Sequence, residues 1–247
     1  MVSDGAVIQF EDVHKSFDEN HVLRGLSFDV PKGKVTTILG PSGSGKSVLL
    51  KHIIGVLKAD SGTVRVLGQD VARLNRSGVQ ALRKRIGVLF QSSALFDSMS
   101  VLENVAFGLR MHAKMPEGEV RAKVAECLRR VNLSGVEDMA PSELSGGMRK
   151  RAALARAIAM DPAIILYDEP TTGLDPKTTN VVGDLILDIQ GQIDITAIVV
   201  THDMPLALRI SDKIALIYRG VIASQGTPKE IETSEEDIIR RFVRGEL

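Results

Sequence analysis

The chain has 247 residues and 44% of them are hydrophobic, which suits a protein with a sizeable core and excludes an intrinsically disordered one. Its 31 Lys and Arg residues match its 31 Asp and Glu residues, so the formal net charge is zero. Non-specific binding of nucleic acid depends on excess positive charge, so we expect no nucleic-acid partner.

Neither a disulfide nor a membrane segment is predicted. The one cysteine, Cys127, has no partner within the chain and is interpreted as a small apolar core residue. The first residues contain no basic segment followed by an apolar run, and no stretch reaches the roughly 18 to 20 apolar residues that cross a bilayer. We therefore expect a cytoplasmic protein that associates with a membrane only through a partner protein.

Short aliphatic runs alternate with helical patterns along the chain and predict an α/β fold with a mostly parallel sheet. The runs are continuous rather than alternating in polarity, as in strands buried on both faces. They lie at 35–39, 86–90, 164–167, 197–200 and 214–217. Two earlier runs, at 7–13 and 26–30, alternate in polarity and predict an antiparallel β piece at the edge of the sheet.

The remaining patterns predict one domain over 1–247 with a helical insertion. Residues 92–160 contain no obvious strand and predict a helical subdomain, broken near Pro116 and Pro141. The tail at 234–247 predicts a short amphipathic helix.

A glycine-rich segment matches the phosphate-binding pattern G-x-x-x-x-G-K-[ST] between the predicted strand 35–39 and a predicted helix at 48–57. In such a P-loop the backbone N–H groups surround a phosphate, and the helix N-terminus adds partial positive charge. Lys46 is expected to reach the β- and γ-phosphates, and the Ser47 hydroxyl to ligate Mg²⁺. The predicted phosphate-binding residues are Gly40, Pro41, Ser42, Gly43, Ser44, Gly45, Lys46 and Ser47.

Acidic and polar residues follow several of the predicted strands. Asp168 and Glu169 end the run 164–167, where Asp168 would hold Mg²⁺ and Glu169 would orient and polarise the attacking water. Gln91 and His202 each follow another run, and Asp175 comes soon after Glu169. Because ligands bind beyond the carboxyl ends of strands in open α/β sheets, these residues are expected at one edge.

A second Ser- and Gly-rich segment, Ser145-Gly146-Gly147, opens a predicted helix that runs to about Met160. It is interpreted as a second phosphate contact at a helix N-terminus. The alternative is an ordinary helix start that Ser145 caps.

The ordered set of these motifs resembles the nucleotide-binding subunit of ABC transporters, over residues 7 to about 230. The resemblance implies two copies paired head-to-tail, with each ATP between residues 40–47 of one copy and Ser145 and Gly147 of the other. It implies that Glu169 is the catalytic base and that His202 contacts the γ-phosphate.

The resemblance assigns three more roles. Gln91 links Mg²⁺ and water to the helical subdomain, and Asp175 communicates across the dimer. Phe17 falls where the family places an aromatic ring against adenine, although Tyr is the commoner residue there. The alternative for Phe17 is a core residue of an edge strand.

Departures from the usual family pattern are similar to the ATPases of bacterial intermembrane phospholipid transporters of the Mla or Mce type. The family's signature motif, here residues 144–148, ends in Met148 rather than Gln, and the stretches 92–99 and 241–245 also look similar. This likeness implies a permease in the inner membrane, an MCE-domain lipid-binding protein and room for a STAS-type regulatory subunit. The chain would then lie on the cytoplasmic face of that membrane.

Two other functions stay open at this point. One is the ATPase of a small-solute importer, for instance for polar amino acids, which would share the same active site. The other is a soluble ABC ATPase without a permease. The basic clusters 83–85 and 149–151 are interpreted as solvated faces.

Overall fold

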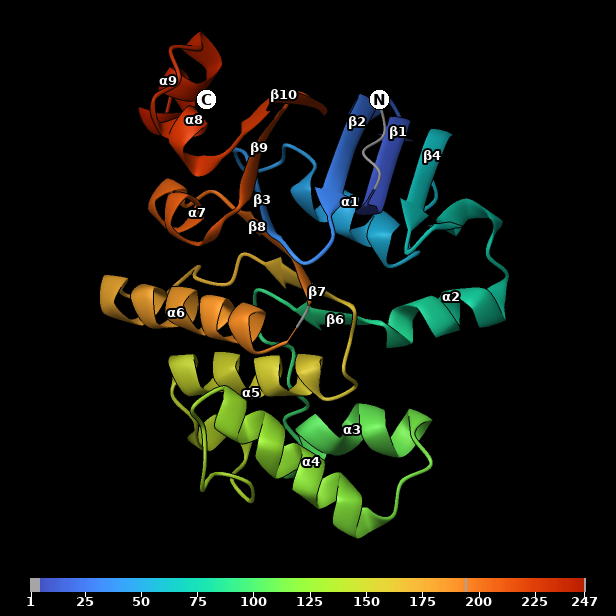
Figure 1. Cartoon of the computed structure of the whole chain (residues 1–247), viewed down its shortest axis with the longest axis vertical. Coiled ribbons are helices and arrows are strands. Elements are labelled where there is room, and N and C mark those ends of the chain that lie inside the picture. Colours follow the sequence, from blue (N-terminus) through green and yellow to red (C-terminus); the bar gives the residue numbers. More distant parts are fainter. Residues whose placement is uncertain (1–4, 194, 247) are drawn as a thin grey trace. The chain divides into compact units, whose positions relative to one another are not determined.

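The computed structural model describes residues 5–193 and 195–246, and these form two units (Figure 1). Unit 1 consists of the described residues up to Arg83 and from Ile195 onward, and unit 2 consists of the described residues from Lys84 to 193. Within the described ranges, no helix is long and apolar enough to cross a membrane.

Unit 1 contains a mainly parallel group of strands. In spatial order these are β10 (Val221–Gly226), β9 (Lys213–Tyr218), β3 (Val35–Leu39) and β8 (Thr196–Thr201). Strand β3 pairs in parallel with both β8 and β9, while β10 pairs antiparallel with β9. Every residue of β3 and β8 is buried, which explains why their sequences are continuous apolar runs. The α/β prediction is therefore confirmed.

Unit 1 also holds a separate antiparallel sheet rather than an antiparallel edge of the first one. Its order is β2 (Asn20–Pro31), β1 (Ala6–Phe17), β4 (Ser61–Val66) and β5 (Gln69–Asp70). Phe10 lies opposite Phe28 on one side and Val64 on the other, so three apolar residues form one cross-strand row.

The helices of unit 1 are short. They are α1 (Lys46–Ile53), α2 (Arg76–Lys84), α7 (Met204–Ile210), α8 (Pro228–Glu232) and α9 (Asp237–Val243), with the 3-10 turn η1 (Val71–Arg73). Helix α1 ends before the predicted 57, close to Gly55, whose positive φ of 65° is the left-handed conformation that terminates helices. The tail helix is likewise shorter than predicted, and Ile239 anchors it in a cluster with Ile231 and Leu216.

Unit 2 combines a parallel strand pair with helices. The pair is β6 (Ile86–Leu89) and β7 (Ile164–Asp168), and the helices are α3 (Val101–His112), α4 (Glu117–Arg130), α5 (Gly146–Ile158) and α6 (Pro176–Gln192), with the 3-10 turn η2 (Pro141–Glu143). Helices α3 and α4 pack against α5, which also contacts β6 (Figure 1). At that contact a Cβ on Gly87 would lie 2.4 Å from the Ala157 carbonyl oxygen, so glycine permits the close approach.

Candidate functional site

The P-loop of unit 1 connects β3 to α1, as the pattern predicts. Gly43 and Gly45 have φ values of 80° and 105°, a left-handed region that residues with a Cβ rarely adopt. Gly40 has no room for a side chain, because a Cβ there would lie 2.6 Å from the Ile217 carbonyl oxygen. These glycines permit the tight backbone turn that is typical of phosphate-binding loops.

The Lys46 ammonium lies against the carbonyls of its own loop. Its Nζ donates to Gly40 O at 2.7 Å and to Pro41 O at 3.0 Å, and the residue is only 7% exposed. The loop therefore contains a buried cation that donates to backbone carbonyls. Ser47, the next residue, is exposed at the first turn of α1.

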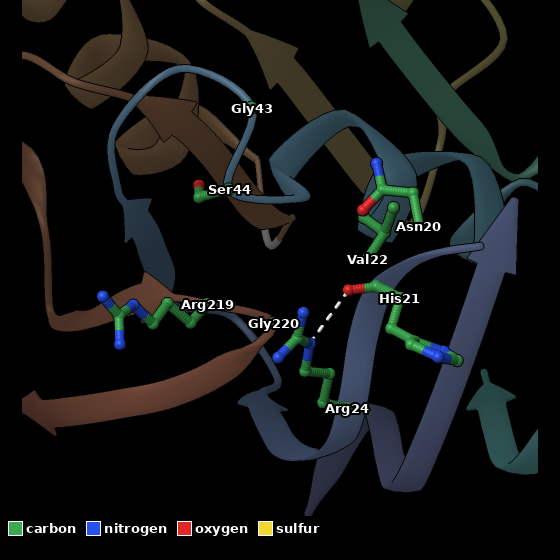
Figure 2. Close-up of a pocket in the computed structure, with 8 residues that line it drawn as sticks. All are labelled: Asn20, His21, Val22, Arg24, Gly43, Ser44, Arg219 and Gly220. Carbon is green, nitrogen blue, oxygen red and sulfur yellow. Dashed lines mark hydrogen bonds between the residues drawn. The ribbon is translucent and has the colours of Figure 1, made fainter.

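A pocket of about 410 Å³ adjoins this loop (Figure 2). It is lined by Asn20, His21, Val22, Arg24, Gly43, Ser44, Arg219 and Gly220. The Arg24 amide donates to Gly220 O at 3.0 Å, which joins β2 to the turn between β9 and β10. The Arg24 Nε donates to His21 O at 3.0 Å, and the Arg219 guanidinium lies 5.2 Å from the centroid of the Tyr218 ring, so two cationic side chains line this pocket beside the P-loop.

Apart from Gly43 and Ser44, sequence reasoning missed the residues that line this pocket. The available signal was the Arg219-Gly220 pair between two aliphatic runs, which is typical of a tight turn. Both residues have positive φ, 50° and 82°, and an arginine rarely adopts that conformation.

Phe17 and His202 are the other two predicted site residues of unit 1. The Phe17 ring is 43% exposed at the end of β1 with the Lys15 ammonium 5.5 Å from its centroid, which excludes the alternative of a core residue. His202 is exposed directly after β8. Its neighbour Asp203 caps α7 by accepting from the Leu206 amide at 3.0 Å.

In unit 2, the structure brings Gln91 and Asp168 to one pocket of about 470 Å³, lined also by Phe90, Ser92 and Thr172. Asp168 is the last residue of β7 and is half-buried. Carboxylate, amide and hydroxyl oxygens are the hard ligands that Mg²⁺ prefers, so this donor set fits that ion.

Glu169 follows Asp168 in a strained conformation, with φ of 48°. The Thr172 hydroxyl donates to Glu169 Oε2 at 3.2 Å, and the Thr172 amide donates to Glu169 O at 3.3 Å. These bonds hold the Glu169 carboxylate at the end of the strand.

Ser145 caps α5, as its alternative interpretation predicts. The Met148 amide donates to Ser145 Oγ at 3.3 Å, while Ser145 and Gly146 are both exposed. Because a serine hydroxyl both donates and accepts, the cap leaves its O–H able to donate to a phosphate. A Cβ on Gly147 would lie 3.2 Å from Thr178 Cγ2, so this glycine lies close to the start of α6.

Asp175 caps α6. Its carboxylate accepts from the amides of Lys177 and Thr178 at 3.0 and 3.1 Å, and from the Thr178 hydroxyl at 2.5 Å. The Thr178 hydroxyl, followed by the Thr178 amide, lowers the pKa of Asp175. Asp175 is thus ionised at neutral pH and has a structural task besides its predicted role across the dimer.

The interpretation of 149–151 as a solvated face is wrong for Lys150. This residue is 6% exposed, and its Nζ donates to Gln91 O at 3.2 Å. The helical spacing explains the burial, because Lys150 shares a face of α5 with the buried Ala153 and Ala157.

We expect Gly40→Ala to destabilise the fold by about 1–3 kcal/mol, the usual cost of inserting a methyl group into packed structure. The new Cβ would meet the Ile217 carbonyl at 2.6 Å. Chemical denaturation of both proteins measures the difference. Gly118→Ala is the matched control, because a Cβ at that helical position meets nothing within 4 Å apart from its chain neighbours and its own helix backbone. Equal stability of the two variants would contradict the described packing.

Known proteins resemble this chain over nearly its full length. The family model described as "ABC transporter" matches residues 23–172. The "Probable ribonucleotide transport ATP-binding protein mkl" of Mycobacterium leprae (strain TN) is 42% identical over 241 residues, which cover 98% of this chain and 70% of the relative.

The "Intermembrane phospholipid transport system ATP-binding protein MlaF" of Haemophilus influenzae is 44% identical over 225 residues, covering 91% of this chain and 85% of the relative. Among solved structures, the "Dimeric Structure of MJ0796, a Bacterial ABC Transporter Cassette" is 31% identical with a TM-score of 0.82. That match covers 90% of this chain and 98% of the other.

Proposed function

Because this chain belongs to the ABC transporter family and is an ATPase of that family, we propose that it powers phospholipid transport between bacterial membranes. The observation that carries the proposal is the 44% identity to the phospholipid-system relative over 91% of the chain. Met148 at the end of the signature and the stretch 92–99 support it. In this proposal 1–247 is one ATPase domain, and 92–160 is its helical subdomain.

ATP hydrolysis is assigned to residues of both units. Lys46 and the P-loop N–H groups bind the triphosphate, and the exposed Phe17 ring stacks on adenine. Glu169 orients the attacking water and accepts its proton, while His202 contacts the γ-phosphate. Ser47, Asp168 and Gln91 would hold Mg²⁺, which when bound neutralises charge on the β- and γ-phosphate oxygens.

Two copies of the chain are proposed to pair head-to-tail, as suits a family with a dimeric cassette of similar fold. Ser145, Gly146 and Gly147 of one copy then contact the ATP held by the other, and Asp175 couples the two sites. Two bound triphosphates favour the closed dimer, and loss of the γ-phosphate removes that preference, because a ligand drives motion only through its different affinity for two states.

We expect Ser145→Ala and Lys46→Ala, each inactive alone, to regain activity when their chains are mixed. A mixed dimer keeps one intact site, and random pairing produces mixed dimers in about half of the molecules. Differently tagged chains establish that mixed dimers form before ATPase activity is measured. Mixed dimers without activity would refute the head-to-tail arrangement.

The partner of unit 2 is proposed to be the permease. Phe96 and Phe107 are 43% and 37% exposed with ring centroids 5.0 Å apart, and Met111 is 63% exposed. An exposed apolar group of this kind is suited to a partner helix. An MCE-domain protein and a STAS-type subunit complete the proposed assembly on the cytoplasmic face of the inner membrane.

Affinity purification from native membranes in mild detergent tests the proposed partners. We expect mass spectrometry to identify a multi-span permease and an MCE-domain protein, with phospholipid bound. Recovery of a permease for ribonucleotides or amino acids instead would leave the ATPase assignment intact and refute the phospholipid assignment. Recovery without any membrane protein, from a preparation that preserves other transporters, would favour an ABC ATPase without a permease.

A further inference from the structure

Two cations of helix α5 hold the loop that follows β6 by its backbone carbonyls. Lys150 Nζ donates to Gln91 O at 3.2 Å, and the Arg156 guanidinium donates to Ala94 O at 2.7 Å and to Ser93 O at 3.1 Å. The two cations are six positions apart, which is about 9 Å along a helix. They therefore fasten this loop at two separate places.

The loop needs such fastening because its own conformation is strained. Ser93 and Ala94 have φ values of 66° and 48°, and neither is glycine. Left-handed residues of this kind cost of order 1 kcal/mol each and persist only where the surroundings hold them. The three carbonyls that accept from Lys150 and Arg156 belong to this segment.

Lys150 differs from an ordinary surface lysine in its surroundings. It is 6% exposed, and burial lowers the pKa of its ammonium while the negative charge of Glu169 acts in the opposite direction. Burying an ammonium is costly unless dipoles or charges compensate. Here the compensation comes from the Gln91 carbonyl and the Glu169 charge, which ties the lysine to two residues of the proposed reaction.

We propose that Lys150 and Arg156 are positioning residues that fasten the loop 91–96 to helix α5 and thereby hold the Gln91 side chain at the pocket it shares with Asp168. The inference rests on the proposed role of Gln91. Since Ser145 and Gly147 begin the same helix, a displacement of α5 is transmitted to Gln91 through the Lys150–Gln91 hydrogen bond. A movement of Ser145 and Gly147, the proposed second phosphate contact, thus also moves Gln91, the proposed Mg²⁺ ligand.

Lys150→Met tests this, because methionine keeps the length and loses the charge and the donor. We expect amide hydrogen exchange in peptides covering 91–96 to accelerate about tenfold, which corresponds to the loss of one hydrogen bond to a charged group. We expect kcat to fall about tenfold and the Mg²⁺ concentration needed for half-maximal activity to rise, since small displacements of a catalytic group greatly reduce the rate. ATP affinity without Mg²⁺ should stay unchanged.

Two matched variants complete the experiment. Lys150→Arg restores the cation and should return both the amide exchange of 91–96 and kcat most of the way to their wild-type values. Lys123→Met removes another partly buried lysine of unit 2, one that pairs with Asp161, and should alter neither the exchange of 91–96 nor kcat.

Unchanged amide exchange of 91–96 in Lys150→Met would overturn the inference. So would a Lys150→Arg variant that recovers neither exchange nor kcat and loses protection throughout unit 2, because Lys150 would then be a merely structural residue. Exchange is read without nucleotide, so it tests the fastening even if the role of Gln91 is wrong. Faster exchange with unchanged kcat would retain the fastening and refute the effect on Gln91.

Discussion

Glu169→Gln is expected to lower ATP turnover at least about 100-fold, because a positioned general base contributes 10²- to 10⁴-fold. Glutamine has the same shape and keeps an oxygen that accepts from the Thr172 hydroxyl, so the local fold should persist. The amide cannot accept the proton of the attacking water, so ATP binds without being cleaved. The uncleaved triphosphate should then hold the closed dimer.

Three measurements check this expectation. Steady-state phosphate release measures the rate of ATP turnover, and binding of a fluorescent nucleotide measures the affinity for nucleotide. Light scattering in the presence of ATP measures the fraction of dimer. Glu119→Gln is the matched control, because this exposed carboxylate of α4 lies outside the site and should leave all three unchanged. Hydrolysis at the wild-type rate by Glu169→Gln would remove Glu169 as the base.

Lys46→Ala is expected to weaken ATP binding about 10- to 100-fold, since a hydrogen bond to a charged group contributes about 1.5–3 kcal/mol. The ammonium is buried against the carbonyls of Gly40 and Pro41, where the triphosphate charge would meet it. Binding should therefore fail through lost charge rather than through unfolding.

The stability of the variant separates these two causes. Removing a buried ammonium relieves its desolvation cost, so the Tm of Lys46→Ala without nucleotide should not fall by more than a few degrees. Lys51→Ala, an exposed lysine of the same helix, should bind ATP like the wild type. Wild-type affinity in Lys46→Ala would contradict the P-loop assignment.

The parallel strands of this fold could be predicted because burial on both faces leaves a continuous apolar run. The run at 35–39 is an example, and all five of its residues are buried in β3. Strands β4 and β5 were missed for the opposite reason. Ser61 and Gly62 open β4 with exposed polar or small residues, which leaves only Val64 and Val66 as a short alternating pattern. Strand β5 has only Gln69 and Asp70, so no hydrophobic pattern marks it.

The candidate site divides in the same way. The residues of the P-loop are contiguous, so phosphate binding could be predicted from their spacing alone. Asn20 and Arg24 of β2 lie almost 200 positions from Arg219 in the chain and share a pocket with it only because β2 reaches the β9–β10 turn, which no local pattern predicts. Lys150 is a third case, since its sequence neighbours suggested a basic surface while the helical period placed it on the buried face.

Lipid movement by the purified complex tests the central claim most directly. The chain is isolated with its membrane partners and reconstituted into vesicles that contain a fluorescent phospholipid, and lipid transfer is followed with and without ATP. We predict ATP-dependent transfer that Glu169→Gln abolishes while the complex stays assembled. A complex that hydrolyses ATP through Glu169 and transfers no phospholipid, but moves a small solute, would contradict the lipid-transport account.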